Sequence, residues 1–279
     1  MTAHDDDSDD SGGHRSTVLR YGAHPSQVVH ATPGAHSGAP LAVLVHGGWW
    51  RDIHGAGLMD PIAADLGAAG WAVCGIEYRR TGAERGIWRQ TLDDAARALA
   101  LSVAGPTGDA ADGPAGNRAA DPGGAAGRRR VVLIGHSVGA QLALLAMRDS
   151  GIDAAGAVLL APVTDLRASA EQGLGEGAVA DFLGADPAAE LYRHTSPLHR
   201  LPFGVAQLVV HGDADQRVPV EQSRAYVRAA RAAGDPVDFA EVPGLDHFAI
   251  IDPAHPSWRT VRAWIGADTG VDTGADLRE

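Results

Sequence analysis

The sequence predicts one α/β domain with a mostly parallel central sheet and helices on both faces. Segments with strand character alternate with segments of helical periodicity, which is the pattern of a parallel sheet covered on both sides. Several strand segments are continuous apolar runs, as expected for strands buried on both faces. One of these runs leads directly into a Gly-x-Ser-x-Gly sequence, which predicts a sharp turn from a strand into a helix.

The first half of the chain supplies two edge strands and the start of the buried sheet. Residues 17–21 and 27–30 are predicted to be short edge strands joined by a turn, and 41–45 is an apolar run typical of a buried strand. A helix is expected over 58–69, because its apolar residues recur at helical spacing until Gly70 ends the pattern. A strand over 71–78 and a helix over 87–103 are expected to follow.

The second half continues the alternation. The run at 131–134 is the strand that leads into the Gly-x-Ser-x-Gly turn, and a helix is expected from Val138 to about residue 147. The remaining predicted strands are 157–160, 207–210 and 237–242, and the remaining predicted helices are 220–233 and 257–265.

The folded domain is expected over residues 17–266. The acidic segment 1–16 is expected to be a disordered tail, and 267–279 a second tail. Residues 105–127 are rich in Ala, Gly, Pro and Asp without periodicity, which predicts a flexible surface insertion. Residues 165–201 contain short helical pieces, such as 176–183 and 187–192, and follow a predicted strand, so this segment is expected to form a lid over the site.

The composition excludes several classes of function. The formal net charge is −12, so neither nucleic acid nor an anionic membrane is expected as a partner. All 23 basic residues are arginine, which excludes mechanisms that need a lysine. The single cysteine, Cys74, cannot form an internal disulfide and is expected in the core. No run approaches the roughly 18 apolar residues of a membrane span, so a cytoplasmic location is expected.

The Gly-x-Ser-x-Gly sequence places Ser137 between Gly135 and Gly139. The two glycines leave room for a strained turn that exposes the serine. The helix that begins at Val138 directs its positive end toward the serine. A serine held in this way is suited to attack a carbonyl, and it needs a base that is itself oriented by a carboxylate.

The partners of Ser137 are expected later in the chain, in the order acid and then histidine. Asp213 and Asp215 both follow the strand at 207–210, and His247 lies in the loop after the last strand. Ser137, Asp215 and His247 are therefore the predicted catalytic triad. Asp213 is the alternative acid, but it lies closer to the strand end, where it is expected to cap the turn.

A third requirement is a set of N–H groups that bind the developing oxyanion. Gly47 and Gly48 follow the buried strand at 41–45 and lack a Cβ, so their N–H groups are free to approach a substrate oxygen. The N–H of Val138, directly after the nucleophile, is expected to be another donor. We call residues 46–50 the glycine loop. His46 begins this loop and is expected to brace it.

The sequence predicts no metal and no organic cofactor. The spacings H-E-x-x-H and C-x-x-C are absent, and no pair of histidines has the spacing of a metal site. The expected partner is a small-molecule ester or amide substrate. The oligomeric state is left open, with a homodimer as one alternative.

The turn at Ser137, the glycine loop and the segment 211–219 together resemble the α/β-hydrolase superfamily over nearly the whole chain. In 211–219, Asp215 matches the acid of an H-G-x-x-D-x-x-V-P pattern. The resemblance implies an α/β-hydrolase fold and a serine mechanism through an acyl-enzyme.

Two segments narrow the resemblance. Residues 46–50 fit the H-G-G-x-W motif of kynurenine formamidases, and 245–251 are similar to the D-H-F ending of those enzymes. The same H-G-G-x-W motif occurs in esterases of the hormone-sensitive-lipase type and in feruloyl or acetyl-xylan esterases. The resemblance implies hydrolysis of an aryl formamide such as N-formyl-kynurenine, with a carboxylesterase on small acyl or aryl esters as the alternative. A catalytically inactive binding protein of this fold is a third interpretation.

An aryl substrate would favour an aromatic wall. Trp49, Trp50 and Phe248 are expected to contact the substrate, although packing in the core is an alternative for Trp50 and Phe248. Tyr78 and Trp88 are expected to be structural.

Overall fold

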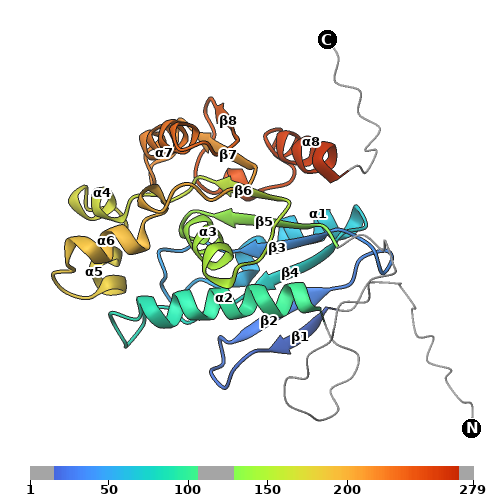
Figure 1. Ribbon diagram of the computed structural model, residues 1–279, viewed down its shortest axis with the longest axis horizontal. Helices are drawn as coiled ribbons and strands as arrows, with labels where there is room; N and C mark the ends of the chain where they lie inside the picture. Colours follow the sequence, from blue (N-terminus) through green and yellow to red (C-terminus); the bar gives the residue numbers. More distant parts are fainter. Residues whose placement is uncertain (1–15, 106–128, 270–279) are drawn as a thin grey trace, which may run out of the picture.

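The computed structural model describes residues 16–105 and 129–269 (Figure 1). Of the insertion expected over 105–127, only residue 105 is among the described residues. The expected tails are described only at residue 16 and at residues 267–269. The last helix continues to Thr269, past the expected domain boundary at 266.

The described residues form one eight-stranded sheet with the strand order β1-β2-β4-β3-β5-β6-β7-β8. β1 pairs antiparallel with β2, and β2 pairs antiparallel with β4, whereas every other neighbouring pair is parallel. This arrangement confirms the predicted mostly parallel sheet with an edge hairpin. The strands are β1 Thr17–Arg20, β2 Val28–Thr32, β3 Leu41–Val45, β4 Ala72–Ile76, β5 Val131–His136, β6 Gly156–Leu160, β7 Gln207–Gly212 and β8 Val237–Val242.

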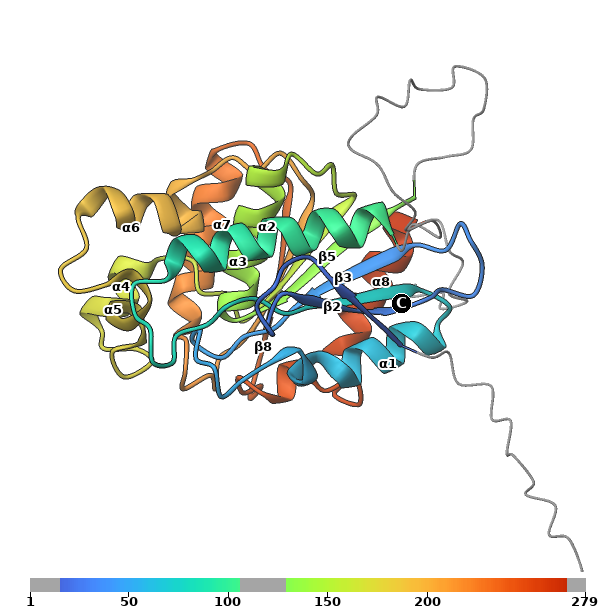
Figure 2. The ribbon, with the colours of Figure 1, turned by 90° about the horizontal axis from the view of Figure 1, so that it is seen from below.

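Helices cover both faces of the sheet, as Figure 2 shows for α2 and α3 on one side and α1 on the other. Alternate residues of β3 belong to two separate cores, because successive side chains of a strand point to opposite faces. One core includes α2, α3 and α7, and the other includes α1 and α8. These helices are α1 Asp60–Ala68, α2 Trp88–Ala104, α3 Val138–Ser150, α7 Val220–Ala232 and α8 Trp258–Thr269.

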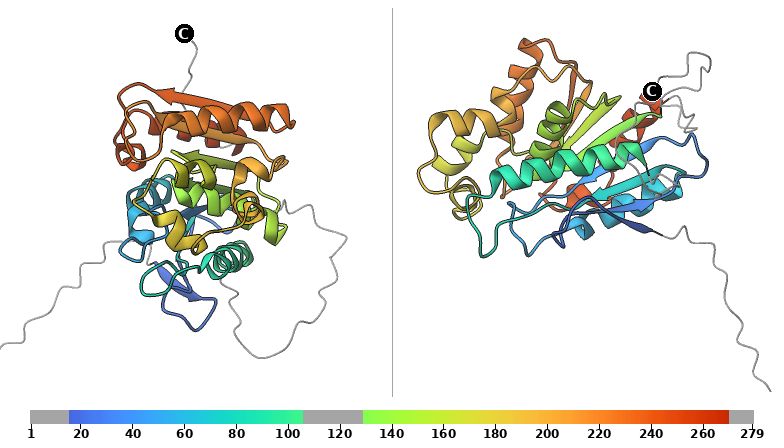
Figure 3. Two further views of the ribbon diagram at one scale, coloured as in Figure 1. Left: turned by 90° about the vertical axis from the view of Figure 1, so that its left-hand side faces the viewer. Right: turned by 60° about the horizontal axis from the view of Figure 1, so that its bottom comes forward.

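The segment between β6 and β7 forms a group of short helices at one end of the molecule (Figure 3). They are α4 Leu166–Glu171, α5 Ala178–Leu183 and α6 Ala189–Thr195. The pieces expected near 176–183 and 187–192 correspond to α5 and α6, whereas α4 was not expected. The side chain of Asp165 accepts a hydrogen bond from the Ala168 N–H and so caps α4. Short 3-10 helices complete the described structure at Ala56–Met59, Pro197–His199 and Ala249–Ile251.

Two of the strands that continue past their predicted ends bear on the site. β5 continues through His136, so that Ser137 is the first residue after the strand. β7 continues through Gly212, so that the acidic loop begins directly at the end of the strand. The apolar pattern does not predict these residues as strand, because each strand ends in one glycine and one histidine rather than in apolar residues.

Candidate active site

Ser137 occupies a strained turn between β5 and α3. Its backbone angles are φ 55° and ψ −123°, and it is the N-cap of α3. A positive φ is unfavourable for a residue with a side chain, and such strain persists only where the surroundings enforce it. Here the Ser137 N–H donates to Leu160 O at 2.8 Å, and Ser137 O accepts from the Val163 N–H at 3.2 Å. The turn is therefore held by β6 and the residues that follow it.

The two glycines that flank Ser137 are needed for close packing rather than for their own backbone angles. A Cβ on Gly135 would lie 2.5 Å from the Cα of Ala140, in the first turn of α3. A Cβ on Gly139 would lie 2.1 Å from Val45 O, at the end of β3. The Gly-x-Ser-x-Gly sequence thus lets α3 start immediately beside two strands.

The structure brings Asp215 and His247 together from two different loops. His247 Nδ1 lies 2.6 Å from Asp215 Oδ2. Asp215 follows β7 and His247 follows β8, and the loops approach each other so closely that a Cβ on Gly212 would lie 1.8 Å from Leu245 O. The other oxygen of Asp215 accepts hydrogen bonds from the N–H groups of Arg217 and Val218, at 2.7 and 2.9 Å.

These contacts keep the Asp215 carboxylate ionised. Burial alone would raise its pKa, but hydrogen bonds from His211, His247 and the Val218 N–H outweigh burial and hold the pKa of Asp215 well below its ordinary value. A charged carboxylate at this place orients the imidazole of His247 and stabilises its protonated form.

The alternative acid has a different role in the structure. Asp213 is exposed, and its side chain accepts a hydrogen bond from the Gly244 N–H at 2.6 Å. Asp246 accepts from the N–H groups of Phe248 and Ala249, both at 2.8 Å. Both carboxylates therefore tie loops together.

His136, the last residue of β5 and the residue directly before Ser137, contacts His247. His136 Nε2 lies 2.9 Å from His247 O, and the two imidazole rings have a centroid distance of 4.6 Å. Burial, followed by the proximity of His247, lowers the pKa of His136 to about 3, so this side chain stays neutral. Ser137 is fully buried, whereas the sequence predicts an exposed serine, and its Oγ has no hydrogen-bond partner within the described chain. The expected bond from Ser137 to His247 is not formed here, and such contacts often tighten only once substrate binds.

The glycine loop lies directly against Ser137. A Cβ on Gly47 would lie 2.9 Å from both the Ser137 Cβ and the His136 Nδ1, so only glycine fits there. Gly48 has a φ of 111°, which favours glycine. Val138 is the first residue of α3, where N–H groups have no partner within the helix. The predicted oxyanion donors Gly47 and Val138 therefore flank Ser137 on two sides.

A buried group of polar and aromatic side chains packs against the glycine loop. The His46 ring stacks on Tyr78 with a centroid distance of 4.4 Å, and the Tyr78 hydroxyl donates to His46 O at 2.8 Å. His46 Nδ1 lies 2.7 Å from Gly47 O. Glu77 contacts His46, Arg80 and the Ala56 N–H, and although burial raises its pKa, these contacts lower it to about 2. His46 and Tyr78 thus brace the loop.

The aromatic residues expected to contact substrate differ in their surroundings. Trp50 is fully buried, its Nε1–H donates to Gln141 Oε1 at 3.0 Å, and its ring stacks on Phe182 at 4.2 Å. These contacts replace the expected substrate contact of Trp50 with a packing role. Phe248 is 50% exposed, and its ring meets the edge of His247. Trp49 is partly exposed.

The segment that contains helices α4 to α6 contacts the glycine loop and the residue that follows it. A Cβ on Gly175 would lie 2.5 Å from the Trp49 ring, and Arg51 donates to Gly175 O at 2.7 Å. Gln141, which holds Trp50, also donates to Thr195 O at 2.8 Å. The segment expected to be a lid therefore packs against the residues next to the nucleophile.

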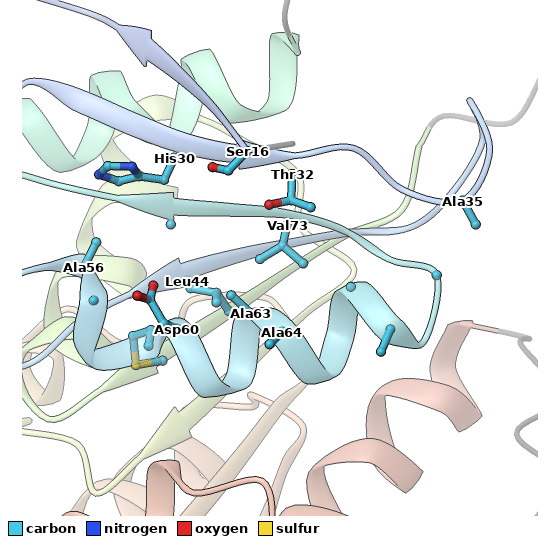
Figure 4. A pocket seen from close by; sticks show the side chains of 16 residues that line it. Ser16, His30, Thr32, Ala35, Leu44, Ala56, Asp60, Ala63, Ala64 and Val73 are labelled. Atoms are coloured by element: carbon cyan, nitrogen blue, oxygen red, sulfur yellow. The ribbon is translucent and has the colours of Figure 1, made fainter. Parts of the chain in front are cut away.

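A cavity of about 970 Å³ lies elsewhere, between α1 and the strands β2 and β4. His30, Thr32 and Asp60 line it together with small residues (Figure 4). None of its lining residues belongs to the triad or the glycine loop. Within 16–105 and 129–269, no group of three or more His, Cys, Asp or Glu side chains is placed to hold a metal ion. No helix in these ranges is long and apolar enough to cross a membrane.

Sequence reasoning missed His211 and Gln141. His211 is fully buried beside Asp215, and Gln141 joins the glycine loop to α6. The spacing of four residues between His211 and Asp215 is a signal that the sequence offered. Gln141 had no such signal, because a glutamine in an apolar helix has no distinctive pattern.

Several known proteins are similar to this chain. The esterase LipC of Mycobacterium tuberculosis is 29% identical over 275 residues, which cover 86% of this chain and 61% of LipC. This chain thus spans less than two thirds of that relative. A truncated carbohydrate esterase from gut microbiota superposes with a TM-score of 0.70 at 17% identity, covering 92% of this chain and 96% of the other.

A phosphonate-inhibited esterase B from Lactobacillus rhamnosis superposes with a TM-score of 0.68 at 17% identity, covering 93% of this chain and 88% of the other. At this identity the two structures show the fold alone. They and the mostly parallel sheet agree with the α/β-hydrolase fold.

The family match extends over the part of the chain that contains the predicted triad. Residues 107–265, more than half of the chain, match the prolyl oligopeptidase family (Peptidase_S9). This range contains the Ser137 turn, the acidic loop and the histidine loop. The chain therefore belongs to the prolyl oligopeptidase family.

Proposed function

We propose that this protein is a serine carboxylesterase that hydrolyses esters of small acyl groups. The observation that carries the proposal is the contact of 2.6 Å between His247 Nδ1 and Asp215 Oδ2, next to a serine on a strained turn. The similarity to LipC, which is named as an esterase, supports an ester rather than a peptide substrate.

The proposed reaction has two halves. His247 accepts the proton of the Ser137 hydroxyl while Ser137 Oγ attacks the ester carbonyl. The N–H groups of Gly47, Gly48 and Val138 bind the oxyanion. His247 then gives the proton to the departing alkoxide, which leaves an acyl-enzyme. Water attacks that acyl group with His247 as base, and the carboxylic acid and Ser137 are released.

Ser137 has no exposed surface, so the side chains that cover it must shift as substrate enters. A confined site of this kind favours a small acyl group over a large one.

An aryl formamide is the second candidate substrate. The motif at 46–50 and the exposed ring of Phe248 beside His247 support it. Trp50 no longer supports it, because this side chain is buried against Phe182 and Gln141.

The test is a kinetic comparison of the wild-type protein with Ser137→Ala on a panel of p-nitrophenyl esters of increasing acyl length, N-formyl-kynurenine and a prolyl p-nitroanilide. We expect the highest kcat/KM on acetyl or butyryl esters and no turnover by Ser137→Ala. A higher kcat/KM on N-formyl-kynurenine would favour the formamidase, and a preference for the anilide would favour a peptidase. Turnover by Ser137→Ala at the wild-type rate would refute the serine mechanism.

A further inference from the structure

His211 is a buried polar side chain that the proposed reaction does not use. It lies near the end of β7, four residues before Asp215, and it is fully buried. Its Nε2 lies 2.9 Å from Val218 O and 3.2 Å from Asp215 Oδ2. Its Nδ1 lies 2.7 Å from Ser223 Oγ on α7. Each ring nitrogen therefore has a defined partner.

The chemistry of these partners fixes the proton on the ring. A carbonyl oxygen and an ionised carboxylate are both acceptors, so Nε2 must carry the hydrogen, which it donates to Val218 O at 2.9 Å while lying 3.2 Å from Asp215 Oδ2. Nδ1 is then the acceptor, and the Ser223 hydroxyl donates to it. The two acceptors at Nε2 thus set the tautomer in which His211 faces Asp215 with its N–H, and the Ser223 hydroxyl satisfies Nδ1 in that tautomer.

The donor from His211 reaches the same carboxylate oxygen that faces His247. Oδ1 of Asp215 is already held by the N–H groups of Arg217 and Val218. With His211 on Oδ2, the carboxylate has donors at both oxygens and cannot rotate without losing one. The orientation of Asp215 in turn sets the orientation of His247.

We propose that His211 is a positioning residue of the active site, which holds Asp215 so that Oδ2 faces His247. The inference rests on the proposed serine mechanism and adds a line of contacts from α7 through Ser223, His211 and Asp215 to the base. His211 does not touch the reacting atoms.

The first experiment reads the tautomer directly. In wild-type protein labelled with ¹⁵N in the histidine side chains, and assigned with His211→Gln, we expect His211 to carry a proton on Nε2 and an unprotonated Nδ1. A His211 resonance pattern with the proton on Nδ1 alone would overturn the proposal, because such a ring has no donor for Asp215. This readout does not depend on which substrate the enzyme uses.

The second experiment measures catalysis with p-nitrophenyl acetate. His211→Leu removes the donor while filling the space, and we expect kcat to fall about 10- to 100-fold, the loss typical of one hydrogen bond to a charged group, with a smaller change in KM. His211→Gln carries an N–H close to the position of Nε2 and is expected to restore most of kcat. Ser223→Ala leaves Nδ1 of His211 without its hydrogen-bond partner and is expected to give an intermediate loss.

The control is His255→Leu. His255 Nδ1 lies 2.8 Å from Ser257 Oγ in the loop before α8, which is a second histidine–serine pair in the same chain. This change is expected to leave kcat within about twofold of wild type. A loss of kcat in His255→Leu equal to that in His211→Leu would show that the effect is general damage to the fold and would overturn the proposal.

A structural readout separates positioning from packing. The proton shared by His247 and Asp215 is expected to give a strongly downfield resonance in wild type and His211→Gln, and to shift upfield or broaden in His211→Leu. An unchanged resonance and an unchanged kcat in folded His211→Leu would overturn the proposal while leaving the serine mechanism intact. If His211→Leu does not fold, the tautomer of the wild-type protein decides, and a His211 proton on Nδ1 alone contradicts the proposal.

Discussion

His247 Nδ1 and Asp215 Oδ2 lie 2.6 Å apart, although the two residues are 32 positions apart in the sequence. Contacts with other residues also hold this pair in place. His136 contacts the backbone oxygen of His247, and two backbone N–H groups bind the other oxygen of Asp215. The imidazole is thereby oriented by contacts that do not involve substrate. Such a pair is what a serine on a neighbouring turn requires as its base.

The assignment of the acid is tested by a matched pair of variants. Asp215→Asn is expected to lower kcat by about 10⁴-fold, because an amide at this place does not stabilise the protonated imidazole and favours the wrong tautomer. Asp213→Asn is expected to stay within severalfold of wild type, since Asp213 is exposed and contacts the Gly244 N–H. Steady-state kinetics on p-nitrophenyl acetate measure both. A larger loss in Asp213→Asn would exchange the roles of the two residues.

The glycine loop is tested by adding one methyl group. Gly47→Ala places a Cβ 2.9 Å from the Ser137 Cβ, so the loop must move away and its N–H groups with it. We expect kcat to fall about 10²- to 10³-fold, the loss typical of one oxyanion donor. Gly67→Ala is the control, because a Cβ there meets nothing within 4 Å. Equal activity of Gly47→Ala and Gly67→Ala would argue against an oxyanion role for this loop.

The buried position of Trp50 leads to a prediction about stability. Trp50→Phe leaves the side-chain oxygen of Gln141 without its donor, and an unsatisfied buried acceptor costs about 1–3 kcal/mol. We expect the free energy of unfolding in urea to fall by this amount. Phe248→Leu, at a half-exposed position, is expected to change it by less than about 0.5 kcal/mol. A larger loss of unfolding free energy in Phe248→Leu than in Trp50→Phe would contradict the packing role of Trp50.

Glu77 gives a prediction about acid stability. Its pKa is lowered from 4.5 to about 2, so its contribution to stability is full above pH 4.5 and is lost as the pH falls toward 2. We expect Glu77→Gln to be less stable than wild type at neutral pH and to approach wild type between pH 4.5 and 2.

Urea unfolding at a series of pH values measures this convergence. Glu190→Gln is the control: Arg193 lowers the pKa of Glu190 too, but this pair is exposed and screened by solvent. A constant difference between wild type and Glu77→Gln across the pH range would contradict the role of Glu77.

The sheet and the contact between Asp215 and His247 were predictable from the sequence for physical reasons. Buried parallel strands are continuous apolar runs, and a Gly-x-Ser-x-Gly turn constrains where its acid and base lie in the chain. The supporting residues were not predictable. Trp50 sits in a motif beside the nucleophile, yet its side chain turns into the core toward Phe182, and no local pattern shows that direction. The contact between Arg51 and Gly175 joins segments more than a hundred residues apart.

The central claim is that Ser137 is the nucleophile of a serine hydrolase. Its most direct test is to treat the protein with a fluorophosphonate and to locate the adduct by peptide mass spectrometry, while following hydrolysis of p-nitrophenyl acetate. We expect one adduct, on Ser137, formed in step with the loss of hydrolysis, and no adduct in Ser137→Ala. An adduct on another residue, or hydrolysis that persists after Ser137 is fully modified, would contradict the account.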